Sequence, residues 1–187
     1  TVTKLGKSFG GVKAVQDISF TLAKGELLAL IGPNGAGKTT TFNMVNGQLR
    51  ADHGSIKLAG HELIGMKPRA IWRLGVGRTF QIAETFDSLT VAENVALAMP
   101  GDFDMAKLSE KIARVSKEYG LPLALTATVA DLSVGERQRI EIVRCLLQEP
   151  KLLIMDEPTA VLTPQEADQL FVTLTRLAKE GCAVIYI

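Results

Sequence analysis

The pattern of apolar and polar positions predicts strands at both ends of the chain. Two runs, Leu27–Ile31 and Leu152–Met155, are apolar at every position, which is typical of strands buried on both faces of a sheet. Residues 1–30 otherwise resemble short strands separated by turns, and residues 55–58 predict one more. The β-branched run Cys182–Ile187 predicts a last strand.

Helical periodicity fills the middle of the chain and the segment before the last strand. Short helices are expected over about 38–47 and 68–74. A longer one runs from Met105 to Tyr119, where apolar residues recur at spacings of three and four, and Gly120 ends it. Capping boxes, a Ser or Thr followed three positions later by Glu, predict three helix starts: Thr90–Glu93, Ser133–Glu136 and Thr163–Glu166. The last of these helices carries the apolar residues Ala167, Leu170, Phe171, Leu174, Leu177 and Ala178 and ends at Gly181.

Strands that alternate with helices on either side of a helical block indicate an α/β fold with a helical insertion. We expect one domain, with the core formed by residues 1–81 and 146–187 and the helical subdomain by residues 82–145. The length of 187 residues agrees with a single domain.

Composition excludes several classes of protein. Hydrophobic residues make up 47% and charged residues 22%, which is ordinary for a folded domain and too apolar for a disordered chain. The net charge of +1 gives no basic surface for nucleic acid, so no nucleic-acid partner is expected. No stretch free of Asp, Glu, Lys and Arg exceeds 11 residues, whereas a spanning helix needs about 20.

A glycine-rich loop follows the first buried strand and precedes a helix. Residues 32–39, Gly-Pro-Asn-Gly-Ala-Gly-Lys-Thr, match the phosphate-loop pattern in the context that the pattern requires. Its backbone N–H groups and the helix N-terminus can bind phosphates, Lys38 can reach the β- and γ-phosphates, and the Thr39 hydroxyl can bind Mg²⁺. The residues expected to bind the nucleotide here are Asn34, Gly35, Ala36, Gly37, Lys38, Thr39 and Thr40. The core is therefore expected to be a P-loop NTPase, with a mixed sheet and antiparallel strands near the N-terminus.

Two carboxylates follow the second buried strand. Asp156 and Glu157 come directly after Met155, so they lie at the carboxyl edge of the sheet, where open α/β folds bind ligands. We expect Asp156 to hold Mg²⁺ through water and Glu157 to polarise the attacking water.

With these motifs in place, nearly the whole chain resembles the nucleotide-binding subunits of ABC transporters. Residues 132–136, Leu-Ser-Val-Gly-Glu, resemble the Leu-Ser-Gly-Gly-Gln signature of that family and depart from it at Val134 and Glu136. The resemblance implies that Ser133, Gly135 and Glu136 meet the γ-phosphate held by another subunit.

Further positions carry roles that only the resemblance implies. Gln81 is similar to the glutamine that contacts Mg²⁺ and the attacking water. Phe9 fits the aromatic residue that stacks on adenine, although a core position in a strand explains it equally well. Thr163 stands where the family usually has an aspartate that bridges subunits. The family's switch histidine would follow the last strand, so we expect the chain to be a fragment that binds ATP and hydrolyses it poorly.

The resemblance also implies partners and a branch of the family, for which we expect the branched-chain amino-acid uptake group, with nucleoside and simple-sugar uptake as the alternative. Expected are ATP and Mg²⁺, a second ATP-binding subunit, integral membrane permease subunits and a solute-binding protein, with the chain peripheral on the cytoplasmic face of the inner membrane. The motifs around residues 31–40, 75–81 and 89–94 favour the branched-chain amino-acid uptake group, whereas residues 158–166 look more like nucleoside and simple-sugar uptake ATPases. A soluble ABC-type ATPase and a P-loop kinase are the alternatives from other classes.

Overall fold

Two sheets organise the chain in the computed structural model, which describes residues 1–79, 85–99, 101, 104–160 and 162–187. One sheet is antiparallel, with the order β2-β1-β4-β5. Its strands are β1 (Val2–Phe9), β2 (Val12–Phe20), β4 (His53–Leu58) and β5 (His61–Glu62). The other sheet is parallel, with the order β3-β8-β7-β6. Its strands are β3 (Leu27–Ala29), β6 (Val76–Thr79), β7 (Leu152–Met155) and β8 (Ala183–Tyr186).

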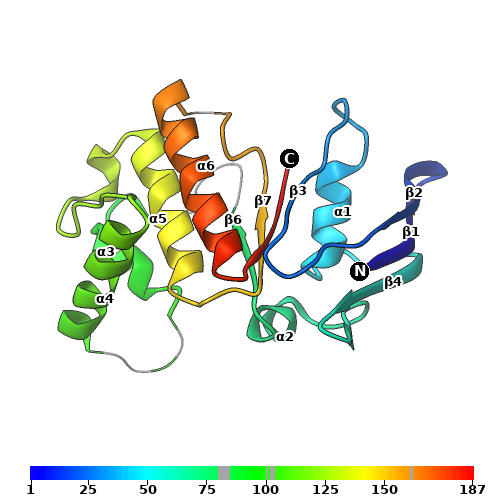
Figure 1. Ribbon diagram of the computed structural model, residues 1–187, viewed down its shortest axis with the longest axis horizontal. Helices are drawn as coiled ribbons and strands as arrows, with labels where there is room; N and C mark the ends of the chain where they lie inside the picture. The colour runs from blue at the N-terminus through cyan, green and yellow to red at the C-terminus, as the bar shows by residue number, and fades with distance from the viewer. Residues whose placement is uncertain (80–84, 100, 102–103, 161) are drawn as a thin grey trace.

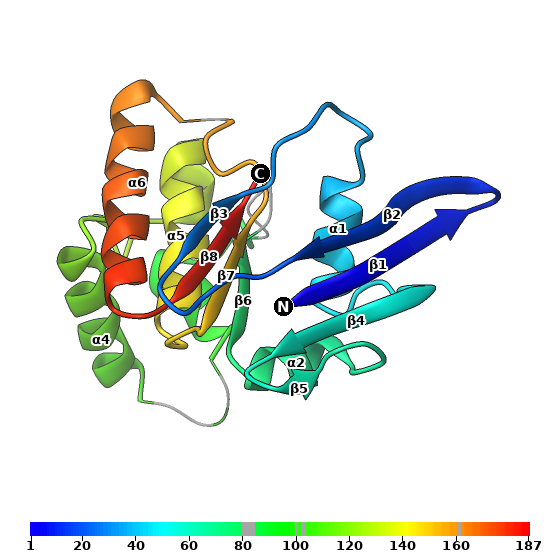
Figure 2. The same ribbon diagram turned by 45° about the vertical axis from the view of Figure 1, so that its right-hand side comes forward.

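The helices cover both faces of the parallel sheet. The described helices are α1 (Lys38–Val45), α2 (Pro68–Arg73), α3 (Val91–Ala96), α4 (Met105–Glu118), α5 (Val134–Leu146) and α6 (Pro164–Lys179), with a 3₁₀ turn at Val129–Asp131. Figure 2 shows α5 and α6 on one side of the parallel strands, and α1 with the antiparallel sheet on the other. This arrangement confirms the expected α/β fold with antiparallel strands near the N-terminus.

The position of β7 between two hydrophobic cores explains why its sequence is apolar throughout. All four of its residues are buried. Leu153 and Met155 pack in the core formed with the helices α3 to α6, while Leu152 and Ile154 pack in the core formed with α1 and the antiparallel sheet. A strand that separates two cores has no face left for polar side chains.

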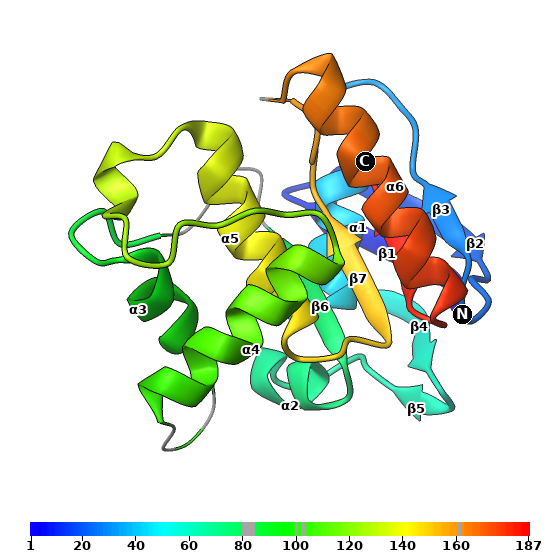
Figure 3. The ribbon, with the colours of Figure 1, turned by 60° about the vertical axis from the view of Figure 1, so that its left-hand side comes forward.

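The helix starts agree closely with their sequence signals. Capping boxes begin α3, α5 and α6, each with both reciprocal hydrogen bonds. Figure 3 shows α3 and α4 grouped beside α5, away from the antiparallel sheet. On α6, Phe171 is 36% exposed, and its ring packs edge-on against that of Tyr186, with 5.7 Å between the ring centres.

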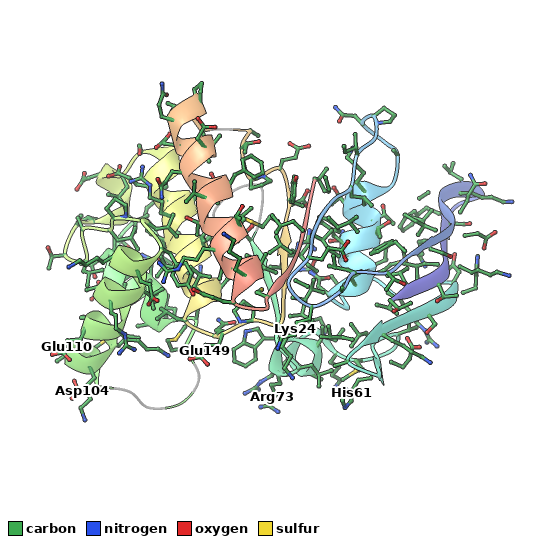
Figure 4. All side chains as sticks on the ribbon, in the orientation of Figure 1. Lys24, His61, Arg73, Asp104, Glu110 and Glu149 are labelled. Carbon is green, nitrogen blue, oxygen red and sulfur yellow. The ribbon has the colours of Figure 1, made fainter. Side chains whose placement is uncertain are left out.

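The segments that carry the candidate functional residues lie along one edge of the molecule. The loop before α1, the carboxyl end of β7 and the starts of α5 and α6 all lie toward the top of Figure 1. The charged side chains labelled in Figure 4, which include Arg73 and Glu149, lie along the opposite edge. Within the described residues, no helix is both long and apolar enough to cross a bilayer.

Candidate nucleotide site

The phosphate loop has the backbone conformation for which its glycines are needed. Gly35 and Gly37 have φ angles of 83° and 82°, a region that other residues adopt only with strain. A Cβ on Gly37 would lie 2.2 Å from the carbonyl oxygen of Ala14, so only glycine fits there. Gly37 also caps α1 without a side-chain hydrogen bond, which leaves the first N–H groups of the helix to an anion.

Lys38 is held within its own loop. Its ammonium group donates hydrogen bonds to the carbonyl oxygens of Gly32 and Pro33, at 2.8 and 2.9 Å. These bonds keep the charge at the mouth of the loop, and a phosphate would compete with the two carbonyl groups for it.

Two adjoining pockets run along the loop. The first, of about 260 Å³, is lined by Ala14, residues 34–40 and Glu157. The second, of about 500 Å³, shares Ala14, Gly35, Ala36 and Lys38 with the first and extends along β2 from Lys13 to Ile18. The structure therefore brings Glu157 to the phosphate loop, as its position after β7 led us to expect.

Asp156 is buried at the end of β7 and is paired with an arginine. Its carboxylate oxygen Oδ2 accepts a hydrogen bond of 3.0 Å from Arg78 of β6, and both side chains are only 8% exposed. The Arg78 guanidinium also donates to the amide oxygens of Asn43 and Gln48, on α1 and just after it. Arg78 thus connects the phosphate-loop helix with the carboxylate expected to hold Mg²⁺.

Glu157 has a strained backbone. Its φ angle is 46°, in the left-handed region that a residue with a long side chain seldom adopts. The N–H of Ala160 donates to its carbonyl oxygen at 3.2 Å, closing a turn immediately after β7. Such conformations persist where the surroundings fix them, and they cluster at functional sites.

The start of α5 forms a second, separate candidate site. The Ser133 hydroxyl accepts from the N–H of Glu136 at 3.3 Å, and the Glu136 carboxylate accepts from the Ser133 N–H at 2.9 Å. Hydrogen bonds from the Ser133 side chain and backbone hold the pKa of Glu136 below its ordinary value. Neither residue lines the pockets along the phosphate loop, although the start of α5 lies at the same edge of the molecule.

Phe9 and Gln81 are two further residues that the sequence leads us to expect at the site. Phe9 lies at the end of β1, 49% exposed, with the Lys7 ammonium 5.6 Å from its ring centre, and it lines neither pocket. Its adenine-stacking role stays a prediction. Gln81 lies outside the described residues. Arg78 is a further residue of the site that no local sequence pattern indicates, because its partner Asp156 lies on another strand.

The hydroxyl of Thr39 and the carboxylate of Asp156 are hard oxygen donors, which suit Mg²⁺. Among the described residues there is no group of three or more His, Cys, Asp or Glu side chains that could hold a metal by themselves. This fits Mg²⁺, which proteins usually bind through one or two side chains together with substrate phosphates.

The sequence of the chain is similar to known proteins of one family. Residues 15–160 match the family model described as ABC transporter. The ribose import ATP-binding protein RbsA of Caldanaerobacter subterraneus subsp. tengcongensis is 39% identical over 98% of this chain and 38% of its own length. The guanosine import ATP-binding protein NupO of Bacillus subtilis is 38% identical over 96% of this chain and 36% of its own length.

Solved structures of ATP-binding cassettes from ABC transporters have the same fold as this chain. A nucleotide-free ATP-binding cassette from an ABC transporter superposes with a TM-score of 0.87 at 28% identity, covering 100% of this chain and 79% of that one. The ADP conformation of MJ1267, an ATP-binding cassette of an ABC transporter, gives a TM-score of 0.86 at 29% identity, with the same coverage. The chain spans less than two fifths of the length of the curated relatives described here.

Proposed function

Because this chain belongs to the ABC transporter family, we propose that it binds and hydrolyses ATP to drive the uptake of a solute. The observation that carries the proposal is the pocket that joins the phosphate loop, Lys38 and Thr39 to Glu157. A loop that binds phosphate and a group that positions or activates the attacking water are among the parts that ATP hydrolysis uses.

Each residue of the site has a role in this proposal. The backbone of residues 34–40 and Lys38 bind the β- and γ-phosphates, and the larger pocket along β2 has room for the nucleoside part. Thr39 and Asp156 would hold Mg²⁺, which supplies charge neutralisation at the phosphates. Glu157 accepts a proton from the attacking water and so makes the water a better nucleophile. Gln81 is proposed to orient this water.

We propose that two such subunits close around two nucleotides. In each site, the phosphate loop of one subunit faces Ser133, Gly135 and Glu136 of the other. The support is that the phosphate loop and the start of α5 lie at the same edge of the chain but line different pockets. A two-fold axis can bring such separated parts together twice in one interface. The proposed division is a core of residues 1–81 and 146–187 with a helical subdomain of residues 82–145.

The solute is proposed to be a simple sugar or a nucleoside. The relatives described here are named for the import of ribose and guanosine. This agrees with the resemblance of residues 158–166 to nucleoside and sugar uptake ATPases. The branched-chain amino-acid group, favoured by three other motifs, has no support among these relatives. The proposed partners are membrane permease subunits, on whose cytoplasmic side the chain would sit, and a solute-binding protein.

The test is the substitution Glu157→Gln. The variant should bind ATP normally, lose turnover and accumulate an ATP-dependent dimer, because the phosphate loop is intact and the proton acceptor is gone. Nucleotide binding, phosphate release and size-exclusion chromatography measure the three effects. Full turnover in this variant would refute the role of Glu157.

Glu149→Gln is the matched control. Glu149 also has a left-handed φ angle, 50°, and also precedes a proline, but it is exposed at the other end of β7. Its substitution should leave turnover unchanged. Lys38→Ala should instead abolish nucleotide binding, which separates the phosphate site from the catalytic step.

A further inference from the structure

Gln138 lies in the second turn of α5 and is almost fully buried, with 6% of its surface exposed. Its amide nitrogen donates a hydrogen bond to the carbonyl oxygen of Pro158, the residue that follows Glu157. A carbonyl oxygen only accepts hydrogen bonds, so the amide nitrogen must face it. The side chain therefore connects the signature helix with the turn that carries the catalytic carboxylate.

The contact belongs to a face of α5 that supports the whole segment between β7 and α6. Gly135, Gln138 and Arg139 share this face because they are three and four positions apart. Arg139 pairs with Glu166 at 2.8 Å, and a Cβ on Gly135 would lie 2.8 Å from a Glu166 carboxylate oxygen. Gln138 thus contacts the residue after Glu157, while Arg139 holds Glu166 in the first turn of α6 and Gly135 leaves room for the Glu166 carboxylate.

The beginning of this segment is where the backbone is strained. Glu157 has a φ angle of 46° and is joined to Pro158, whose ring fixes its own φ angle. A residue in this region keeps its conformation only if the neighbouring groups prevent it from relaxing. The hydrogen bond from Gln138 to the Pro158 carbonyl restrains the peptide unit directly after Glu157.

We propose that Gln138 is a positioning residue that keeps Glu157 directed toward the phosphate loop. The proposal rests on the proposed role of Glu157 as the group that activates water. It also implies that the start of α5, which is proposed to meet the nucleotide of the other subunit, is connected to Glu157 of its own subunit by one side chain.

The other end of the Gln138 amide argues against a role in packing alone. Its oxygen is buried and has no hydrogen-bond partner within the part of the chain that the structure describes. A buried acceptor without a partner costs free energy, and an apolar side chain of the same size would avoid this cost. The amide is therefore retained for the bond that its nitrogen donates.

The test replaces Gln138 by methionine, which has a similar length and cannot donate. The dissociation constant for ATP should stay within about twofold, while kcat should fall about tenfold, the rate equivalent of one lost hydrogen bond. Gln165→Met is the matched control, because Gln165 is exposed on α6 in the pocket that Gln138 also lines. This control should leave both constants unchanged. If Gln138→Met does not fold, Gln138→Asn replaces it, since it keeps the amide but shortens its reach by one methylene.

A double-mutant cycle separates positioning from a general structural effect. If Gln138 acts through Glu157, Gln138→Met should not lower the residual turnover of Glu157→Gln any further. An equal proportional loss in both backgrounds would overturn the proposal, and so would an unchanged kcat in the single variant.

Amide hydrogen exchange tests the contact without turnover. Gln138→Met should speed exchange over residues 157–160, where the Ala160 N–H is hydrogen-bonded to Glu157, and leave α1 unchanged. Unchanged exchange there refutes the positioning role. Failure of the wild-type chain to bind ATP would instead refute the proposed function, so the two failures are distinguishable.

Discussion

Removal of the Arg78 side-chain charge should destabilise the fold more than any exposed substitution. In Arg78→Met, Asp156 keeps its position at the end of β7 but loses the guanidinium 3.0 Å away. Both side chains are 8% exposed, so water cannot replace the lost partner. The hydrogen bonds to Asn43 and Gln48 are also lost.

The expected magnitude follows from burial. Breaking a buried ion pair by removing one partner costs about 3–5 kcal/mol, because the remaining charge is left without compensation. A chain of this size loses about 2–4 °C in Tm for each kcal/mol. The Tm of Arg78→Met should therefore fall by roughly 6–20 °C.

Thermal unfolding followed by circular dichroism measures this effect. Arg73→Met is the control, since Arg73 is exposed at the end of α2 and its loss should change the free energy of unfolding by less than about 0.5 kcal/mol. Adding Asp156→Asn to Arg78→Met should recover part of the loss, because no charge is then left unpaired. A loss below about 1 kcal/mol in Arg78→Met, or no recovery in the double variant, would refute the reasoning.

Two further predictions concern the phosphate loop and the start of α5. Gly37→Ala should abolish nucleotide binding, measured by fluorescence titration, because its Cβ would lie 2.2 Å from the Ala14 carbonyl oxygen. Gly35→Ala should weaken nucleotide binding less, because no atom lies within 4 Å of its added Cβ. Since Ser133 holds the pKa of Glu136 below 4.5, this carboxylate stabilises the fold above that pH and loses its contribution as pH falls further. The free energy of unfolding, measured with urea, should therefore fall less steeply with decreasing pH in Glu136→Gln than in the wild-type chain. Equal pH dependence in the two proteins would contradict the capping role of Glu136.

Helix starts, a buried strand and the phosphate loop can be predicted from the sequence, because a local pattern determines each of them. The capping boxes at Thr90, Ser133 and Thr163 each begin a helix, and the apolar run at residues 152–155 is a buried strand. These features depend on neighbours within four residues or on burial of a whole segment. The phosphate loop is of the same kind, because its glycines serve the backbone that contains them.

Contacts between distant segments could not be read in the same way. Arg78 meets Asp156 across 78 positions, and Gln138 meets Pro158 across 20. Each pairing depends on strand order and helix packing, which no local pattern contains. The 36% exposure of Phe171 could not be predicted either, because the exposure of a helical side chain depends on what lies opposite it.

The left-handed backbone of Glu157 has a consequence for how such a protein responds to selection. A glycine at this position would adopt the same φ angle without strain, so it would relieve the backbone while removing the group proposed to activate water. Selection for a relaxed backbone alone would therefore not preserve the carboxylate proposed to activate water. The glutamate is expected to persist only where turnover is required together with stability, which makes position 157 a site of direct conflict between the two demands.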